Sequence, residues 1–318
     1  MKKILTTVLC ILILTLGLSG CGKDEAASPD NNGSNNANNT QDNVTGENND
    51  VQDTTEDTEG VEDLAEQEDN TNIEVGIEIE EQVIFDQEGF KITALNIEDT
   101  FLGPEIRLLI ENSSDTNITV QAKETSINDL MIEPAFSSNV AAGKKAKEGI
   151  TFLSDDLKIN EIETIANIEF ILDIFNTETW DTIIESDPII IHTSESETYV
   201  QEYDDTGEVI YEGNDIKIVE KGLMTDDFFG PVIKLYIENN SNTGVTVQAR
   251  DVSVNGFMVE PAFSADVSPG KKANEGITFF DLEENQIDEI TQAEFTLEIF
   301  DTITWDTIAT TDTIQLEY

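Results

Sequence analysis

The sequence predicts an all-β protein whose folded part consists of two tandem β-sandwich domains. Three observations lead to this prediction. The second half of the chain repeats the first, apolar residues in each copy alternate with polar ones, and Asn-Gly or Pro-Gly turn signals separate the alternating runs. The residues before the first copy have a different composition and predict an export signal followed by a linker.

Residues 1–20 have the organisation of a signal peptide. Lys2 and Lys3 precede an apolar run from Ile4 to Leu18. The run ends in Leu18-Ser19-Gly20-Cys21, which resembles the lipobox of bacterial lipoproteins. The resemblance implies a diacylglyceryl group on Cys21, cleavage after Gly20 and anchoring in the membrane by the lipid. The alternative is an uncleaved membrane span, but the apolar run is shorter than the ~20 residues that a spanning helix needs.

Residues 21–81 form an acidic, Asn-rich segment that we expect to be a disordered tether. Large apolar residues are almost absent before about Asn72, so most of this segment cannot build a core. Repulsion between like charges extends such a linker. We therefore expect a lipid-anchored protein on the extracellular face of the cytoplasmic membrane, with its folded part extending into the cell wall.

The charge and the cysteines exclude several classes of protein. The chain has 67 Asp plus Glu against 16 Lys plus Arg, a formal net charge of −51, which repels phosphate backbones and argues against a nucleic-acid partner. The two cysteines are Cys10, inside the signal peptide, and Cys21. No disulfide framework remains after processing, so burial and sheet hydrogen bonds must hold the domains together.

The tandem duplication sets the domain boundaries. Residues 99–152 align with 226–279 without a gap and with about 60% of positions identical. A two-residue difference follows, and the register then recovers in the runs that begin at Phe170 and Phe295. We assign the first repeat to residues 82–193, a linker to 194–206 and the second repeat to 207–318. The linker contains Tyr199, Val200 and Tyr203, and it either docks on a repeat or adds a strand to the second one.

Period-two alternation predicts half-buried strands in each copy. The buried sets include Ile106, Leu108 and Ile110 in one strand and Phe170, Leu172 and Ile174 in another. The nearest helical pattern is a single turn at residues 159–165, with a counterpart at 286–290. Seven or more short strands per copy of about 110 residues, joined by regular turns, are typical of an immunoglobulin-like sandwich.

Turn residues connect these strands. Asn255-Gly256 is a strong hairpin signal because both residues tolerate positive φ, and Asn128-Asp129 is a weaker form of it in the first copy. Pro269-Gly270 fits a type II turn, and the first copy keeps the glycine as Gly143.

A family resemblance accompanies this pattern. The segment Ile110-Glu111-Asn112-Ser113-Ser114, its counterpart at residues 237–241 and the Asn-Gly hairpin are similar to immunoglobulin-like domains of uncharacterised Gram-positive lipoproteins, a domain-of-unknown-function type. The resemblance covers both repeats. It implies a location and an architecture but no chemistry.

The sequence lacks the parts of common catalytic sites, so we do not expect an enzyme. The only histidine, His192, follows an apolar run and is expected in a last strand. No cysteine remains free for nucleophilic catalysis, and no Gly-x-Ser-x-Gly elbow or phosphate loop is present. The expected function is a non-catalytic surface lipoprotein whose modules bind or present an envelope or extracellular ligand.

Paired lysines give one candidate binding site. Each copy has two of them directly after the glycine turn, in a chain with few cations: Lys144, Lys145, Lys271 and Lys272. A basic tip of this kind fits a cell-wall polymer or an acidic surface protein as partner. The alternative is that the lysines only keep an exposed turn or edge strand soluble.

Recurring carboxylates give a second candidate. Glu111, Glu133, Glu238 and Glu260 occupy matching positions in the two copies. Oxygen ligands gathered at one end of a sandwich could hold calcium, which makes a calcium-dependent adhesion or structural module the alternative function. No other cofactor is expected. A solute-binding lipoprotein fits less well because it needs α/β lobes, and an envelope hydrolase fits less well because no acid and base pair is recognisable.

Overall fold

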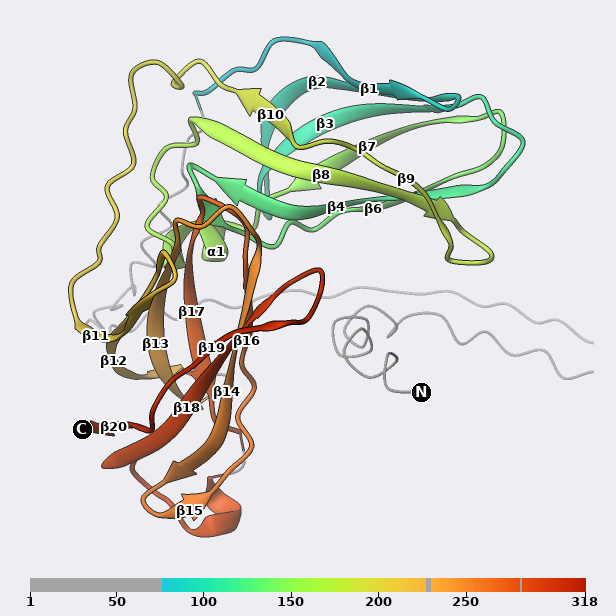
Figure 1. Cartoon of the computed structure of the whole chain (residues 1–318). Helices are drawn as coiled ribbons and strands as arrows, with labels where there is room; N and C mark the ends of the chain where they lie inside the picture. Colours follow the sequence, from blue (N-terminus) through green and yellow to red (C-terminus); the bar gives the residue numbers. More distant parts are fainter. Residues whose placement is uncertain (1–75, 227–229, 281) are drawn as a thin grey trace, which may run out of the picture. The chain divides into compact units, whose positions relative to one another are not determined.

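The computed structural model describes residues 76–226, 230–280 and 282–318, and all of these belong to one compact unit. The signal peptide, Cys21 and the tether up to residue 75 lie outside the described residues. Apart from one α-helix and one short 3₁₀-helix, the elements of the described part are β-strands (Figure 1). Neither helix is long and apolar enough to cross a membrane.

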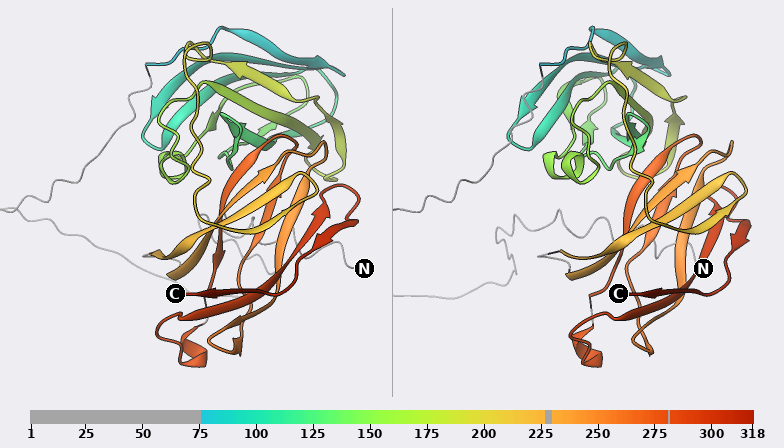
Figure 2. Two further views of the ribbon diagram at one scale, coloured as in Figure 1. Left: turned by 60° about the vertical axis from the view of Figure 1, so that its left-hand side comes forward. Right: turned by 90° about the vertical axis from the view of Figure 1, so that its left-hand side faces the viewer.

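The first sandwich consists of two antiparallel layers. Its strands are β1 (Gln82–Gln87), β2 (Phe90–Thr100), β3 (Gly103–Asn112), β4 (Ile118–Ile127), β5 (Leu130–Met131), β6 (Ser137–Val140), β7 (Lys145–Thr151), β8 (Asn167–Asn176), β9 (Thr182–Glu185) and β10 (Ile189–His192). One layer has the order β1-β2-β3-β7, and the other contains β10-β8-β4 with β5 and β6 paired to β4 and β9 paired to β8. Figure 2 shows the two layers in turned views.

The second sandwich repeats this arrangement strand by strand. It contains β11 (Glu208–Gly213), β12 (Ile216–Asp226), β13 (Gly230–Asn239), β14 (Val245–Val254), β15 (Phe257–Met258), β16 (Ser264–Val267), β17 (Lys272–Thr278), β18 (Gln292–Asp301), β19 (Thr307–Thr310) and β20 (Ile314–Glu317). Its layers run β11-β12-β13-β17 and β15-β14-β18-β19, with β16 on β14 and β20 on β18. The predicted all-β architecture of two tandem immunoglobulin-like sandwiches is confirmed.

Each sandwich has its own apolar core. The predicted alternation is confirmed on β3 and β8, where every second side chain is fully buried: Ile106, Leu108, Ile110, Phe170, Leu172 and Ile174. At roughly 25 cal/mol per Å² of apolar area removed from water, such burial is the main stabilising contribution. His192 lies at the exposed end of the last strand of the first sandwich, as predicted.

The hairpin turns have the predicted backbone. φ is +49° at Asn128 and +64° at Asp129, and it is +50° at Asn255 and +82° at Gly256, which fits a type I′ turn in both copies. The asparagine side chain also fixes the neighbouring chain. The Oδ1 atom of Asn128 accepts hydrogen bonds from the backbone N–H groups of Ala166 (2.9 Å) and Asn167 (3.0 Å).

The Glu-Asn segment that carried the family resemblance has a structural role. Asn112 and Asn239 are both buried. Nδ2 of Asn112 donates to the carbonyl oxygens of Thr116 (2.8 Å) and Val140 (3.0 Å), and Asn239 makes the matching bonds in the second copy. A buried polar group must be satisfied in this way, so the motif ties a strand end to the turn beside it.

Both helices lie a few residues before the positions predicted for them. Helix α1 runs from Ser154 to Ile159 and ends where the predicted turn begins, and the 3₁₀-helix η1 runs from Glu283 to Asn285. The negative charges of Asp155 and Asp156 in the first turn of α1 stabilise the helix by interacting with the positive end of its dipole. Leu157 packs into the first core. Ile162 and Ile165 are also buried, which explains the apolar pattern without a helix there.

Candidate functional site

The two sandwiches meet at a junction that joins their sheets. β5 of the first sandwich pairs in parallel with β17 of the second, with Leu130 opposite Lys272. The backbone N–H of Lys272 donates to the carbonyl oxygen of Asp129 at 2.9 Å. One layer of the first sandwich thereby continues into a layer of the second as a single 10-stranded sheet.

Lys271 is the charged centre of this junction. Lys271 is only 8% exposed, and its Nζ donates to Oδ1 of Asp129 (2.8 Å) and to Oε2 of Glu169 (2.7 Å). Burial alone would lower the pKa of the Lys271 ammonium, but the hydrogen bonds and charges of the two carboxylates raise it above its ordinary value. A lysine from the second sandwich therefore forms ion pairs with two acids of the first.

The linker packs into the same junction through Tyr203. Its hydroxyl donates to the carbonyl oxygen of Asn128 (2.8 Å), and the Nζ of Lys272 lies 4.4 Å from its ring centroid, within cation–π range. Burial raises the pKa of the Tyr203 phenol to about 12. The linker docks rather than adding a strand, because residues 194–206 contain no strand.

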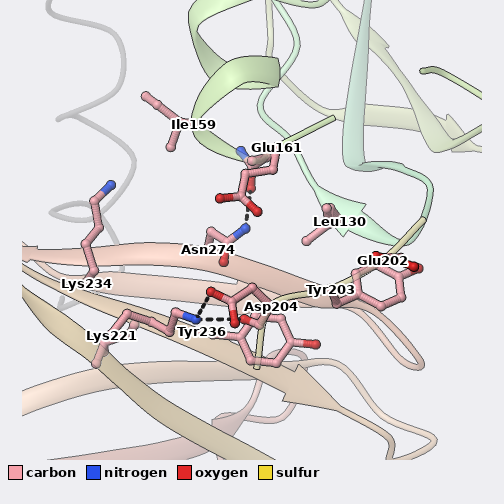
Figure 3. A pocket seen from close by; sticks show the side chains of 12 residues that line it. Leu130, Ile159, Glu161, Glu202, Tyr203, Asp204, Lys221, Lys234, Tyr236 and Asn274 are labelled. Carbon is pink, nitrogen blue, oxygen red and sulfur yellow. Dashed lines mark hydrogen bonds and ion pairs between the residues drawn. The ribbon is translucent and has the colours of Figure 1, made fainter. Parts of the chain in front are cut away.

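A pocket of about 180 Å³ lies along the junction (Figure 3). Its polar walls are bonded to each other. Nζ of Lys221 lies 2.5 Å from Oδ2 of Asp204, and Nδ2 of Asn274 donates to Oδ1 of Asn160 at 3.2 Å. These pairs join the linker and the first sandwich to the second, so we regard the pocket as part of the seam between the sandwiches.

The four predicted lysines lie in two environments. Lys271 and Lys272 belong to the junction, whereas Lys144 and Lys145 are exposed. Lys145 forms an ion pair with Glu111 across β3 and β7, with its own side chain 65% exposed. The basic binding tip stays a prediction, and the structure adds that its two copies differ in accessibility.

The four predicted glutamates do not form one cluster. Glu111 lies opposite Lys91 and Lys145 in register, and Glu238 lies opposite Lys217 and Lys272. Glu133 follows β5 and Glu260 follows β15, both exposed. Within the described ranges no group of three or more potential metal-binding side chains could hold an ion. The calcium site stays an alternative prediction without support from these positions.

The strand β17 that receives β5 also carries a recurring carboxylate, Glu275, whose pKa is shifted. Burial raises the pKa of Glu275 on β17 to about 7; the charge of Lys234 opposes this shift, and the charges of Asp266 and Glu133 add to it. Its counterpart in the first copy, Glu148, is exposed. The recurrence of a glutamate was visible in the sequence, but the shift of its pKa depends on groups that the fold brings near it, among them Glu133 of the first sandwich.

The free end of the second sandwich exposes apolar side chains. Phe257 and Met258 on β15 are 50% and 67% exposed. Their counterparts in the first copy are covered, since Leu130 is 2% exposed and Met131 packs against the second core. A pocket of about 230 Å³ lies beside β15 and is lined in part by Met258, Glu260 and Phe280.

No protein-family model and no curated protein matches this chain. The solved structures that are similar to it include the following three. A YadV chaperone is 11% identical over 67% of this chain and 92% of its own (TM-score 0.22). The CsuC-CsuE chaperone and tip adhesion subunit complex of Acinetobacter baumannii is 10% identical over 66% and 90% (0.19). A protein of unknown function from Porphyromonas gingivalis W83 is 10% identical over 68% and 91% (0.19). Because these TM-scores are far below 0.5, we infer nothing about this protein from the three structures. The fold is assigned from the strand order described above.

Proposed function

We propose that this protein is a non-catalytic, lipid-anchored surface protein whose two sandwiches bind or present a ligand in the cell envelope. The lipid is attached to Cys21, and the acidic tether holds the folded part away from the membrane. Its location is the extracellular face of the cytoplasmic membrane, reaching into the wall. The signal-peptide pattern and the lipobox-like residues before Cys21 support this location.

The observation that carries the binding role is the exposed apolar hairpin of β15. Contiguous apolar surface at the end of a soluble domain is typical of an interaction site. Phe257 and Met258 lie on a turn whose counterpart in the first sandwich is already an interaction surface. The exposed turn at Lys144 and Lys145 is the corresponding free surface of the first sandwich.

A binding assay with purified cell walls tests this role. Residues 22–318 contain every member of both cores and are the sample. We expect wild type to co-sediment with walls, and the variants Phe257→Ser with Met258→Ser and Lys144→Glu with Lys145→Glu to be retained several-fold less. Val200→Ser, at an 82% exposed position of the linker, is the control. Equal retention of all variants, or no retention of wild type, would contradict the proposal.

Location has its own test. In cells that produce the full chain, wild type should incorporate labelled fatty acid. Cys21→Ser removes the acceptor of the lipid and should abolish this incorporation. Unchanged labelling of Cys21→Ser would contradict lipid anchoring.

A further inference from the structure

The junction uses two different surfaces, one from each sandwich. The first sandwich contributes the surface around its Asn128-Asp129 hairpin, with Leu130 and Glu169, which we call the hairpin surface. The second contributes the turn at Gly270 with Lys271 and Lys272. We call this turn, and the matching turn at Gly143 with Lys144 and Lys145, a lysine turn. Such a contact is heterologous, and a repeated module carries both of its halves. Each chain therefore retains one unused lysine turn and one unused hairpin surface.

At its Lys145 end, the unused strand β7 is an open edge that presents its backbone in the same way as β17 does. β7 ends the order β1-β2-β3-β7, and its counterpart β17 is the strand that receives β5. The N–H of Asn112 donates to the carbonyl oxygen of Lys144 (2.8 Å), which makes these two residues a hydrogen-bonded pair of the antiparallel ladder. The next pair, Glu111 and Lys145, is therefore a non-hydrogen-bonded pair. In such a pair both backbone groups point away from the partner strand. The N–H of Lys145 is thus directed outward, as is that of Lys272, which donates to Asp129.

The unused hairpin surface keeps most of its binding groups. β15 ends the order β15-β14-β18-β19, as expected for the counterpart of β5. Phe257 and Met258 replace Leu130 and Met131, and Glu294 replaces Glu169. Of the two carboxylates that bind Lys271, that of Asp129 has no counterpart, because Gly256 stands at that position.

We propose that a second copy of this chain binds these two free surfaces, so that molecules associate head to tail. This inference rests on the proposed binding function and adds a second copy to the envelope ligand as a partner of the same surfaces. The lysine turn of one chain, at Lys144 and Lys145, docks on the Phe257 and Met258 hairpin of the next and repeats the internal junction. Lys144 pairs with Glu294 of the second chain, and the N–H of Lys145 donates to the carbonyl oxygen of Gly256.

The contact between chains is weaker than the internal one. It lacks the carboxylate of Asp129, and no linker raises the local concentration of the partner surface. The net charge of −51 also repels a second copy. A heterologous contact that does not close adds further molecules in the same way, so we expect concentration-dependent growth rather than a fixed dimer.

Gly256→Asp offers a gain of function. The backbone at Gly256 has φ of +82°, close to the +64° that Asp129 adopts. A Cβ added at Gly256 meets no atom within 4 Å. The variant supplies the missing acceptor for Lys144 and should shift association to concentrations about tenfold lower, as one charge-assisted hydrogen bond allows.

Sedimentation velocity of residues 22–318 tests the proposal at about 0.15 M salt, where a Debye length of about 8 Å screens the long-range repulsion. The sedimentation coefficient of wild type should rise with concentration up to about 1 mM. Lys144→Glu with Lys145→Glu, and separately Phe257→Ser with Met258→Ser, should abolish this rise. Val200→Ser should associate like wild type. Thermal melts that match wild type exclude misfolding as the cause.

Mixing the two defective double variants gives the sharpest readout. The lysine variant keeps an intact hairpin and the hairpin variant keeps an intact lysine turn, so the mixture should form dimers and nothing larger. A wild type and a Gly256→Asp variant that both stay monomeric, or a mixture that stays monomeric, would overturn head-to-tail association. If the end variants still lose binding to cell walls in that case, the proposed function stands and only the second copy is excluded as a partner.

Discussion

The two lysine turns have nearly the same local sequence and the same backbone, yet they differ in almost every other property. Gly143 and Gly270 have φ of +68° and +72°, and in each copy the N–H of the first lysine donates to a carbonyl three residues earlier. Lys144 nevertheless lies in solvent, whereas Lys271 is buried between two carboxylates.

The difference comes from what lies opposite each turn. The second turn faces the Asn128-Asp129 hairpin, and the first faces solvent in this structure. Local residues therefore fix the shape of a turn, and the neighbouring module decides whether its lysines are ion-paired or available. Three predictions test how far this contrast extends.

The largest effect is expected from removing the buried ammonium. Lys271→Met removes both charge-assisted hydrogen bonds that join the second sandwich to Asp129 and Glu169, and it should destabilise the protein by about 2 kcal/mol. Lys144→Met should change stability by less than about 0.5 kcal/mol. Urea unfolding measures both, with Trp180 and Trp305 reporting one sandwich each. Equal effects of the two variants would contradict the contrast between the turns.

A smaller effect is expected from the buried carboxyl group next to the lysine turn. The pKa of the Glu275 carboxyl group is about 7 in the folded protein, against an ordinary value of 4.5 in the unfolded chain. The native state therefore binds a proton at Glu275 more tightly than the unfolded state does. The resulting stability is fully present below about pH 4.5 and is lost as the pH rises to about 7. Glu275→Gln should therefore gain about 1–2 kcal/mol relative to wild type at pH 8.

The control for this pH dependence is the counterpart in the first copy. Glu148 is exposed, so Glu148→Gln should keep the wild-type dependence of stability on pH. Thermal melts between pH 4.5 and 8 give the comparison. If Glu275→Gln and wild type lose stability in parallel over this interval, Glu275 does not titrate as proposed.

The smallest effect is expected from calcium. Glu111 and Glu238 each lie between two lysines in register, which leaves little negative charge for a divalent ion. The melting temperature in about 5 mM calcium should equal that in chelator at the same ionic strength, because only binding to the native state raises it. A rise of several degrees would restore the calcium-dependent alternative. A rise confined to one sandwich would locate the site.

The features that could be predicted are those in which one local pattern has one structural solution. Alternation on the strand that begins at Gly103 required one buried face, and Asn255-Gly256 required a turn with two positive φ angles. The helix was misplaced because buried Ile162 and Ile165 imitate helical spacing while belonging to an irregular segment. Tyr203 was noticed in the linker, but the sequence left open whether it docks.

By itself the sequence determined the duplication, the two β-sandwich modules and their turns, because these depend on residues close in the chain and on a period of two. It also provides the motif for an export address at Cys21. Only the tertiary structure decided that Lys271 joins Asp129 and Glu169, that Tyr203 covers the joint and that Phe257 and Met258 stay exposed. The physical reason is that burial and ion pairing depend on which module lies across an interface, and the local sequence of a copy does not specify which module covers it.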